Sequence, residues 1–362
     1  MLLTMLKKFS RPFWIMILLT FLILIIPIYF LFYSQNTHPT QNKIITTTTM
    51  LNDAVKHLLG DVDEQENKDS RYQNINSISC LPPLMGVGID PHNYKIKLSD
   101  RKKIKNADLI ILNGLHLEAK MISAIELLKN VDNIWKAGEE SLDDADKLKG
   151  DVESSDVDPH IWFDIDLWIK VIKKLKEKIA KILTTNEDKE KLEGNYNNFE
   201  KDLLNLKNHI IKELKELKSS KEQEGSQLII VTAHDAFSYW ENFSHKNKCN
   251  FQLKSIQGVS TQTEANMRQI IDLAQELVDN NVKAIFTESS MPKTSLESLK
   301  EEINNLRKSK GLEPIQIPEN IELYSDSLGK DDQIEELNNN RYKHSTYIGA
   351  FLNNMKIIKA YV

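Results

Sequence analysis

The sequence predicts an α/β fold with two lobes, each built on a parallel-type sheet, and one long helix joining them. Three observations lead to this prediction. Short apolar runs typical of buried parallel strands occur in both halves of the chain, at residues 107–112 and 282–287. Helical patterns alternate with these runs, as they do in α/β proteins. Between the two sets, residues 187–219 carry the strongest helical pattern in the chain.

The first lobe is predicted at residues 36–186, beginning with a short polar tether. β-branched and apolar runs predict its strands, which we expect at residues 44–49, 75–80, 107–112 and 133–136. Its helices are expected at residues 50–59, from Ser99-Asp100 onward, and at 117–129. Residues 61–73 and 139–158 are acidic and polar, which predicts surface connections.

A linking helix is predicted at residues 187–220. Its apolar residues recur at spacings of three and four: Leu192, Tyr196, Phe199, Leu203, Leu206, Ile210, Leu214 and Leu217. The 33 residues 187–219, which carry this pattern, would extend about 50 Å as a helix, enough to cross one lobe and enter the next. A coiled-coil dimer is the alternative, but the spacing drifts from strict heptads, so we expect a monomer.

The second lobe is predicted at residues 221–362, where the alternation restarts after Gly225. Strands or extended segments are expected at residues 228–232, 282–287 and 315–323. Helices are expected at residues 236–243, 267–279, 295–308 and 346–361.

The N-terminal residues 1–35 read as a signal or anchor. Residues 13–33 carry no charge, and Lys7, Lys8 and Arg11 precede them. This asymmetry predicts a cytoplasmic N-terminus and export of the rest, to the periplasm or the outer face of the inner membrane. The apolar length fits a transmembrane helix, and no small-x-small cleavage site follows, so an uncleaved anchor and a cleaved signal both stay open. No Cys stands at the end of this segment, which argues against a lipid anchor.

The exported part is acidic. Removing the three basic residues of the leader leaves 44 basic residues against 52 acidic ones, a net charge near −8. This balance argues against a nucleic-acid partner and favours cations. Cys80 and Cys249 could form one disulfide or stay apart in different lobes, which the sequence leaves open.

The tripeptide Asp-Pro-His occurs twice, ending at His92 and at His160. Proline fixes its own φ and makes the preceding residue extended, so each imidazole sits on a stiff turn that suits a metal ligand. A third imidazole, His234, follows an apolar run, and a carboxylate, Asp326, follows an extended segment. Three imidazoles and one carboxylate are suitable donors for one transition metal.

The four candidate ligands come from both predicted lobes, and three of them follow predicted strands. Because α/β sheets bind ligands at the carboxyl ends of their strands, we expect the metal in the cleft between lobes. Each of the four residues, taken alone, could be an ordinary turn or cap residue. Only their occurrence together favours a metal site. His116 is expected at a helix start or behind the ligands. The remaining imidazoles are expected on the surface or, for His38, in the tether: His57, His209, His245 and His344.

An enzyme is the main alternative. Glu288 ends the predicted strand 282–287 and could act as a general base, which would make the chain a metal-dependent hydrolase. Its simpler reading is a buried carboxylate bonded to backbone amides. The chain has no His-Glu-x-x-His and no Gly-x-Ser-x-Gly. A third reading is a surface adhesin or structural protein whose metal is incidental.

The motifs resemble those of the metal-binding receptors of bacterial zinc and manganese ABC importers, the cluster A-I solute-binding proteins. Seven ordered segments between residues 44 and 360 carry the resemblance: 88–94 (GIDPHNY), 107–118 (ADLIILNGLHLE), 158–164 (DPHIWFD), 232–237 (TAHDAF), 257–260 (QGVS), 285–290 (IFTESS) and 324–328 (YSDSL).

The resemblance implies a non-enzymatic receptor with two α/β lobes, a rigid linking helix and a metal between the lobes. It implies that His92, His160, His234 and Asp326 bind the metal, and that an ABC permease receives it. Residues 117–157 contain no His, unlike the His-rich loop of many zinc-specific members. The donor set favours Zn²⁺, with Mn²⁺ a close second and Fe²⁺ also compatible.

Overall fold

A four-stranded parallel sheet forms the first half of the fold. The computed structural model describes residues 26, 41–62, 71–150, 157–261, 267–318 and 321–362. The strand order is β2-β1-β3-β4, and all neighbours run parallel. The strands are β1 (Asn42–Thr46), β2 (Ile78–Cys80), β3 (Leu109–Leu112) and β4 (Ile134–Lys136). Every residue of β3 is buried, which explains its uninterrupted apolar sequence.

Helices cover this sheet: α3 (Thr49–Leu59), α4 (Leu98–Asn106), α5 (Ala119–Leu128), the short α6 (Ala137–Ser141) and α7 (Ile165–Ala180). Thr48 caps the start of α3, and Gly60 ends it at φ 72°, a conformation that glycine adopts without strain. The sequence expectations omit α7, although its buried residues recur at spacings of three and four and Asp164 caps its first turn.

The second half contains two parallel strand pairs. β5 (Ile229–His234) pairs with β6 (Gln252–Gln257), and β7 (Thr287–Glu288) pairs with β8 (Glu322–Leu323). The backbone N–H of Phe286 donates to the carbonyl of Val231 at 2.9 Å, which places the two pairs side by side. The surrounding helices are α9 (Ser238–Lys246), α10 (Met267–Asp279) and α11 (Thr294–Ser309). Strand β6 was not expected from the sequence.

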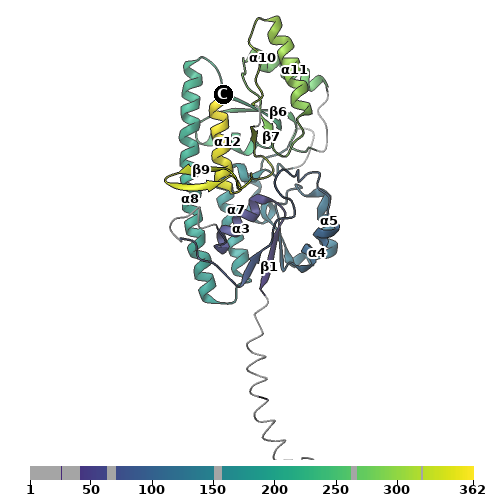
Figure 1. Ribbon diagram of the computed structural model, residues 1–362, viewed down its shortest axis with the longest axis vertical. Helices are drawn as coiled ribbons and strands as arrows, with labels where there is room; N and C mark the ends of the chain where they lie inside the picture. Colours follow the sequence, from purple (N-terminus) through teal and green to yellow (C-terminus); the bar gives the residue numbers. More distant parts are fainter. Residues whose placement is uncertain (1–25, 27–40, 63–70, 151–156, 262–266, 319–320) are drawn as a thin grey trace, which may run out of the picture. The chain divides into compact units, whose positions relative to one another are not determined.

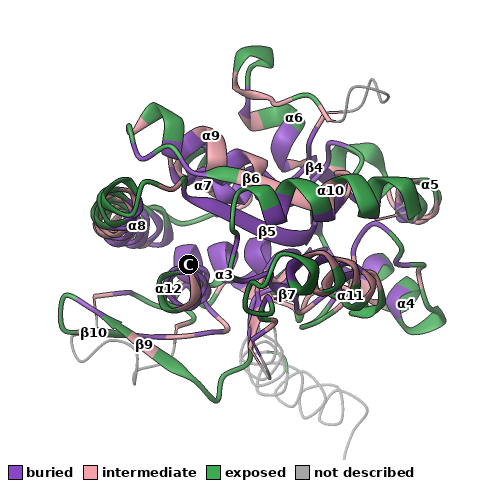
Figure 2. Ribbon diagram, turned by 90° about the horizontal axis from the view of Figure 1, so that it is seen from above, coloured by how far each residue is buried: buried purple, intermediate pink, exposed green. Residues whose placement is uncertain are grey.

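The longest helix is α8 (Asn186–Gln223), with 38 residues. It packs on α3 and α7 of the first half and on α12 (Tyr347–Tyr361), the C-terminal helix, as Figure 1 shows. Figure 2 shows its buried side turned toward the sheets and its exposed side turned away. The prediction of one long helix beside parallel sheets is confirmed. A hairpin of β9 (Ile334–Leu337) and β10 (Asn340–Lys343), absent from the expectations, lies against α12.

One of the three hydrophobic clusters among the described residues runs through both halves. Phe163 of the first half packs against Phe237 and Trp240 of the second, with ring centroids 4.3 and 6.2 Å apart, and against Phe351 of α12. All buried core residues belong to a compact unit, Asn42–Val362. The lobe boundaries 36–186, 187–220 and 221–362 remain predictions within this unit.

The structure describes very little of the predicted N-terminal leader. The unit Met1–Gln41 is described only at Ile26 and Gln41, so the predicted segment 13–33 lies almost wholly outside the described residues. Within the described part of the chain, no helix has the length and apolar character needed to span a membrane.

Candidate metal centre

His92, His160, His234 and Asp326 meet at one point. Each of the four offers one ligand atom that lies within 4.8 Å of the other three. Nε2 of His160 lies 3.3 Å from Nε2 of His92 and 3.3 Å from Oδ1 of Asp326. Nε2 of His234 lies 3.3 Å from Oδ2 of Asp326. All four side chains are buried, none with more than 3% of its surface exposed.

The four side chains come from loops and strand ends in both halves. His234 is the last residue of β5, and Asp326 lies three residues beyond the end of β8. His160 precedes a short 3₁₀ helix, Ile161–Phe163, and His92 lies in the connection between β2 and α4. The two Asp-Pro-His turns share one geometry: the Asp carboxylate accepts the backbone N–H of the His two residues later, at 2.8 Å for His92 and 2.9 Å for His160.

Carboxylates behind two of the imidazoles turn their Nε2 atoms toward the centre. Oδ1 of Asp158 lies 2.7 Å from Nδ1 of His160, and Oε2 of Glu288 lies 2.6 Å from Nδ1 of His234. A carboxylate at Nδ1 holds the proton on that nitrogen and leaves Nε2 free to bind a metal. Nε2 of His234 and Oδ1 of Asp326 are buried, and each faces another member of the cluster at 3.3 Å. Buried donors of this kind fit a bound cation.

Glu288 uses one carboxylate oxygen for His234 and the other for backbone N–H groups. Its Oε1 accepts the backbone N–H groups of Ala233 and His234 at 2.7 and 2.9 Å, and the side chain is 1% exposed. The simpler interpretation of Glu288 from the sequence, a buried carboxylate bonded to backbone amides, describes this arrangement. A general base needs a carboxylate that can reach a water or substrate proton, whereas Glu288 is directed at His234.

Without a metal, the carboxylates of the centre favour the charged forms of two of its imidazoles. Burial alone would lower the pKa of His160, but the carboxylates of Asp158 and Asp326 outweigh it and raise that pKa to about 9. Burial also opposes the charge on His234, yet Glu288 and Asp326 raise its pKa well above the ordinary value. The two imidazolium rings overcome burial at Asp326 and lower its pKa well below the usual range. For His92, burial outweighs the attraction of Asp326 and lowers the pKa to about 3.

Two contacts link the halves at the centre, and the sequence reasoning did not identify them. Thr261 Oγ1 donates to Oδ2 of Asp90 at 2.8 Å, so the carboxylate that positions His92 also holds a residue of the second half. The backbone N–H of Gly88 donates to Oγ of Ser327 at 2.8 Å, beside the ligand candidate Asp326. Thr261 directly follows the motif segment 257–260, and no local sequence pattern there indicates Asp90 as its partner.

Further contacts support the centre from behind. The Ser290 hydroxyl lies 3.4 Å from Oδ2 of Asp326. Trp162 Nε1 donates to the carbonyl of Ser325 at 3.0 Å, and Asn113 Nδ2 donates to the carbonyl of Pro159 at 2.9 Å. The ligand-bearing loops are therefore tied to the sheets and to one another.

The other histidines that the structure describes do not join the cluster, and two expectations for them were wrong. His38, expected in the tether, lies outside the described residues. His57 is buried and stacks on Phe199, because it lies on the face of α3 that packs on α8. His344 is also buried, within 3.1 Å of Tyr324 Oη and 3.3 Å of Glu335 Oε1. His245 is exposed, as expected, and His116 is exposed at φ 65°.

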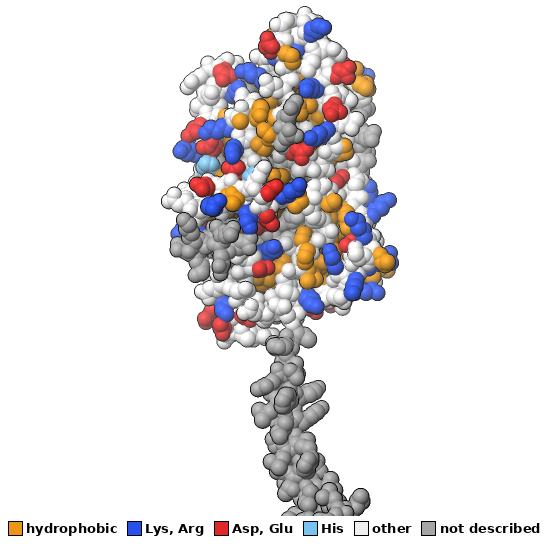
Figure 3. Space-filling model, in the orientation of Figure 1, with side chains coloured by type: hydrophobic (Ala, Val, Ile, Leu, Met, Phe, Trp, Pro, Cys, Tyr) orange, Lys and Arg blue, Asp and Glu red, His pale blue; other side chains and the backbone are white. Residues whose placement is uncertain are grey.

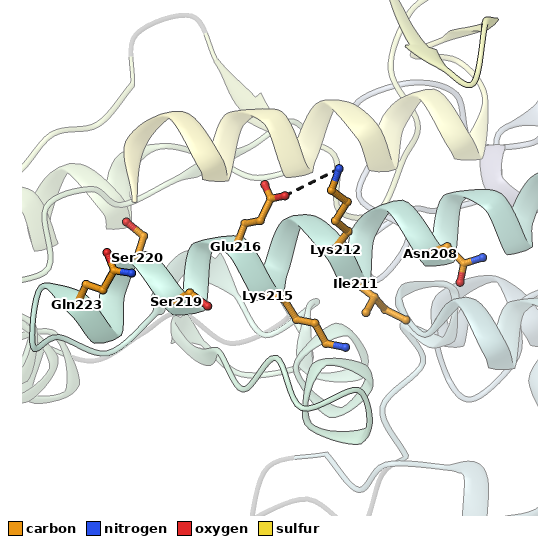
Figure 4. A pocket seen from close by; sticks show the side chains of 8 residues that line it. All are labelled: Asn208, Ile211, Lys212, Lys215, Glu216, Ser219, Ser220 and Gln223. Atoms are coloured by element: carbon orange, nitrogen blue, oxygen red, sulfur yellow. Dashed lines mark ion pairs between the residues drawn. The ribbon is translucent and has the colours of Figure 1, made fainter.

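The thiols and the surface groove of α8 also lie apart from the centre. Cys80 and Cys249 are both free, so the structure contains no disulfide between them. An open groove runs along α8, and all the residues lining it belong to that helix, with Lys212 and Glu216 paired at 3.9 Å (Figure 4). The groove contains none of the four clustered residues.

A family model described as ZnuA, the periplasmic component A of a zinc-uptake complex, matches residues 44–361. The chain belongs to this family. It is 31% identical over 320 residues to the zinc-binding protein TroA of Treponema pallidum, a match that covers 88% of this chain and 87% of TroA. It is 31% identical over 303 residues to the manganese-binding lipoprotein MntA of Bacillus subtilis, covering 82% and 85% of the two chains.

A solved structure in this family shares the fold. The periplasmic zinc-binding protein TroA from Treponema pallidum superimposes with a TM-score of 0.70 at 29% identity, covering 89% of this chain and 99% of that one. The resemblance inferred from the seven sequence segments is therefore confirmed at the level of family and fold.

Proposed function

We propose that the chain is an extracytoplasmic receptor that captures a divalent metal ion and delivers it to the permease of an ABC-type importer. The observation that carries the proposal is the buried cluster of His92, His160, His234 and Asp326. Membership of the periplasmic zinc-uptake family supports the assignment to transport. The proposed ligand atoms are the Nε2 atoms of the three imidazoles and the carboxylate of Asp326.

The donor set favours Zn²⁺ as the transported ion, with Mn²⁺ second and Fe²⁺ also compatible. Three imidazoles and one carboxylate form a four-donor site suited to tetrahedral Zn²⁺. One 31%-identical relative is named for zinc and the other for manganese, so family membership is compatible with either ion. Both oxygens of Asp326 lie near imidazoles, and a bidentate carboxylate would provide a fifth donor, an oxygen, which suits the harder Mn²⁺.

Capture and release, without catalysis, fit the geometry best. A catalytic metal needs an open position for water, and the four donors here are closed off from solvent. Glu288 serves His234, which leaves the hydrolase alternative without its proposed base. We propose that the receptor acts as a monomer outside the cytoplasm and is tethered to the membrane if its leader is retained. The contacts between the halves favour release by small loop shifts over wide opening.

Metal analysis tests the proposal. Residues 36–362, purified without chelators, are expected to contain one equivalent of zinc or manganese by elemental mass spectrometry. His234→Ala is expected to abolish it, whereas His245→Ala, which changes an exposed histidine on α9, keeps it. Absence of metal, together with no thermal shift on adding Zn²⁺ or Mn²⁺, would refute metal capture.

A further inference from the structure

The helix α4 exposes a basic face that metal capture does not explain. Leu98, Arg101, Lys102 and Lys105 follow the spacing i, i+3, i+4, i+7, which places them on one side of a helix. All four are exposed, and Leu98 retains 83% of its surface. We call these four residues the α4 face. Figure 3 shows Lys and Arg side chains mixed with hydrophobic ones at the lower right, where Figure 1 places α4 and α5.

The positive charge of the α4 face is uncompensated. Among the described residues, none of Arg101, Lys102 and Lys105 forms an ion pair. By contrast, many lysines on or next to α7, α8 and α11 pair with carboxylates. The one acid of α4, Asp100, is buried and accepts hydrogen bonds from Tyr94 Oη at 2.6 Å and from the backbone of Lys97 at 2.9 Å. It is therefore turned inward, away from the exposed cations.

Apolar and basic residues at the end of α5 and just after it extend this face. Lys129 Nζ donates to the carbonyl of Lys105 at 3.2 Å, which brings the end of α5 against the end of α4. Leu127 and Val131 flank Lys129 in sequence and are 87% and 67% exposed. Asp108, Glu126 and Asp132 are the acids nearby in sequence. Asp108 accepts the backbone N–H of Lys43 at 2.8 Å, and Glu126 forms an ion pair with Lys136 at 3.3 Å. Cations interspersed with isolated exposed Leu and Val side chains are typical of surfaces that bind anionic membranes.

The chain enters the folded unit beside this surface. Lys43 and Asp108 exchange backbone and side-chain hydrogen bonds, and Asp108 lies two residues beyond the end of α4. Eight residues, 34–41, separate the predicted apolar segment from Asn42, and they reach at most about 28 Å at ~3.5 Å per residue. A leader retained in the membrane would hold the point of entry, and with it α4, near the bilayer.

We infer that the α4 face, together with Lys129, Leu127 and Val131, docks on the anionic phospholipid surface of the membrane. The lysines and the arginine bind lipid phosphates, and the exposed Leu and Val side chains enter the interfacial region. Docking would keep the receptor on the membrane that contains its permease even if the leader is cleaved. An acidic protein partner is the competing occupant, but it would not require the exposed apolar side chains.

Vesicle co-sedimentation tests the inference with residues 42–362, which contain the whole described hydrophobic core. The probes are phosphatidylcholine vesicles with and without phosphatidylglycerol. We expect binding only to vesicles with phosphatidylglycerol, and loss of binding at high salt because screening shortens the range of the attraction. The triple variant Arg101→Gln/Lys102→Gln/Lys105→Gln is expected to bind about 100-fold more weakly.

A matched variant separates the face from overall charge. Lys173→Gln/Lys174→Gln/Lys181→Gln removes the same charge from exposed positions on or just after α7 and is expected to bind like the unchanged chain. Equal loss in both triple variants would overturn the inference, because net charge alone would then explain binding. Failure of the unchanged chain to bind phosphatidylglycerol at low salt would also overturn it and would favour an acidic protein partner. Thermal melts check that both variants are folded.

Discussion

Oε2 of Glu288 lies 2.6 Å from Nδ1 of His234, and Oε1 of the same carboxylate accepts the backbone N–H groups of Ala233 and His234. One buried carboxylate at the end of β7 therefore fixes both the end of β5 and the orientation of its imidazole. Because Nδ1 faces Glu288, Nε2 is the atom available to a metal, and the carboxylate increases its basicity.

Glu288→Gln tests this relationship. The substitution keeps the shape but removes the charge, so we expect metal affinity to fall about 10- to 100-fold while one equivalent still binds at saturation. Competition with a chelator of known affinity measures the change. Glu297→Gln, at an exposed position in the first turn of α11, serves as the control. Unchanged affinity in Glu288→Gln would mean that Glu288 does not act through His234.

Metal binding should release protons. The pKa of His160 is raised to about 9 and that of His234 well above its ordinary value. Both rings are therefore expected to be positively charged at pH 7 before metal binds, with a proton on each nitrogen. His92, with its pKa lowered to about 3, is already neutral. The metal must displace the two protons, so apparent affinity should rise with pH from 6 to 8, by up to about 100-fold per pH unit.

Calorimetry in buffers of different ionisation enthalpy measures this release directly. A dependence corresponding to about two protons per metal ion at pH 7 is expected. Binding without proton release at that pH would contradict the charged state inferred for His160 and His234.

Thr261 should slow metal release. Its hydroxyl donates to the carboxylate of Asp90, which also positions His92, and hydrogen bonds to charged groups contribute about 1.5–3 kcal/mol. Thr261→Val keeps the shape and removes the donor, so we expect metal to dissociate about 10-fold faster in a chelator chase. Thr261→Ser retains the hydroxyl and should dissociate at the original rate. Equal rates in Val and Ser variants would remove this contact from the release step.

Metal should stabilise the folded chain, and the ligands should be required for it. An ion that binds only the folded form stabilises it by about 2.7 kcal/mol at a free concentration 100 times Kd, so Tm should rise. His160→Ala should lose most of this shift and weaken binding by several kcal/mol, while the metal-free variant melts cooperatively. An unchanged Tm of the original chain on adding metal would contradict this prediction. It would favour the alternative of a surface adhesin or structural protein whose metal is incidental.

Much of the fold could be predicted because burial leaves periodic traces. The buried residues Leu192 to Leu217 indicated α8 by their spacing, and the apolar run 107–112 indicated β3. The omission of α7 was avoidable, since Asp164 and the spacing of its buried residues signalled a helix. Strand β6 was less predictable, because only Ile256 among its residues is buried and its sequence has no continuous apolar run.

The sequence by itself determined the donors of the candidate site. The two Asp-Pro-His turns are local structures, and each Asp carboxylate binds the backbone of a His two residues away. Only the tertiary structure decided which nitrogen of each imidazole faces the centre and what closes it. Glu288 acts on a strand 55 residues earlier, and Thr261 binds a carboxylate 171 residues away. A hydrogen bond depends on a few tenths of an ångström between groups that only chain folding brings together, whereas turn and helix patterns follow from neighbouring residues.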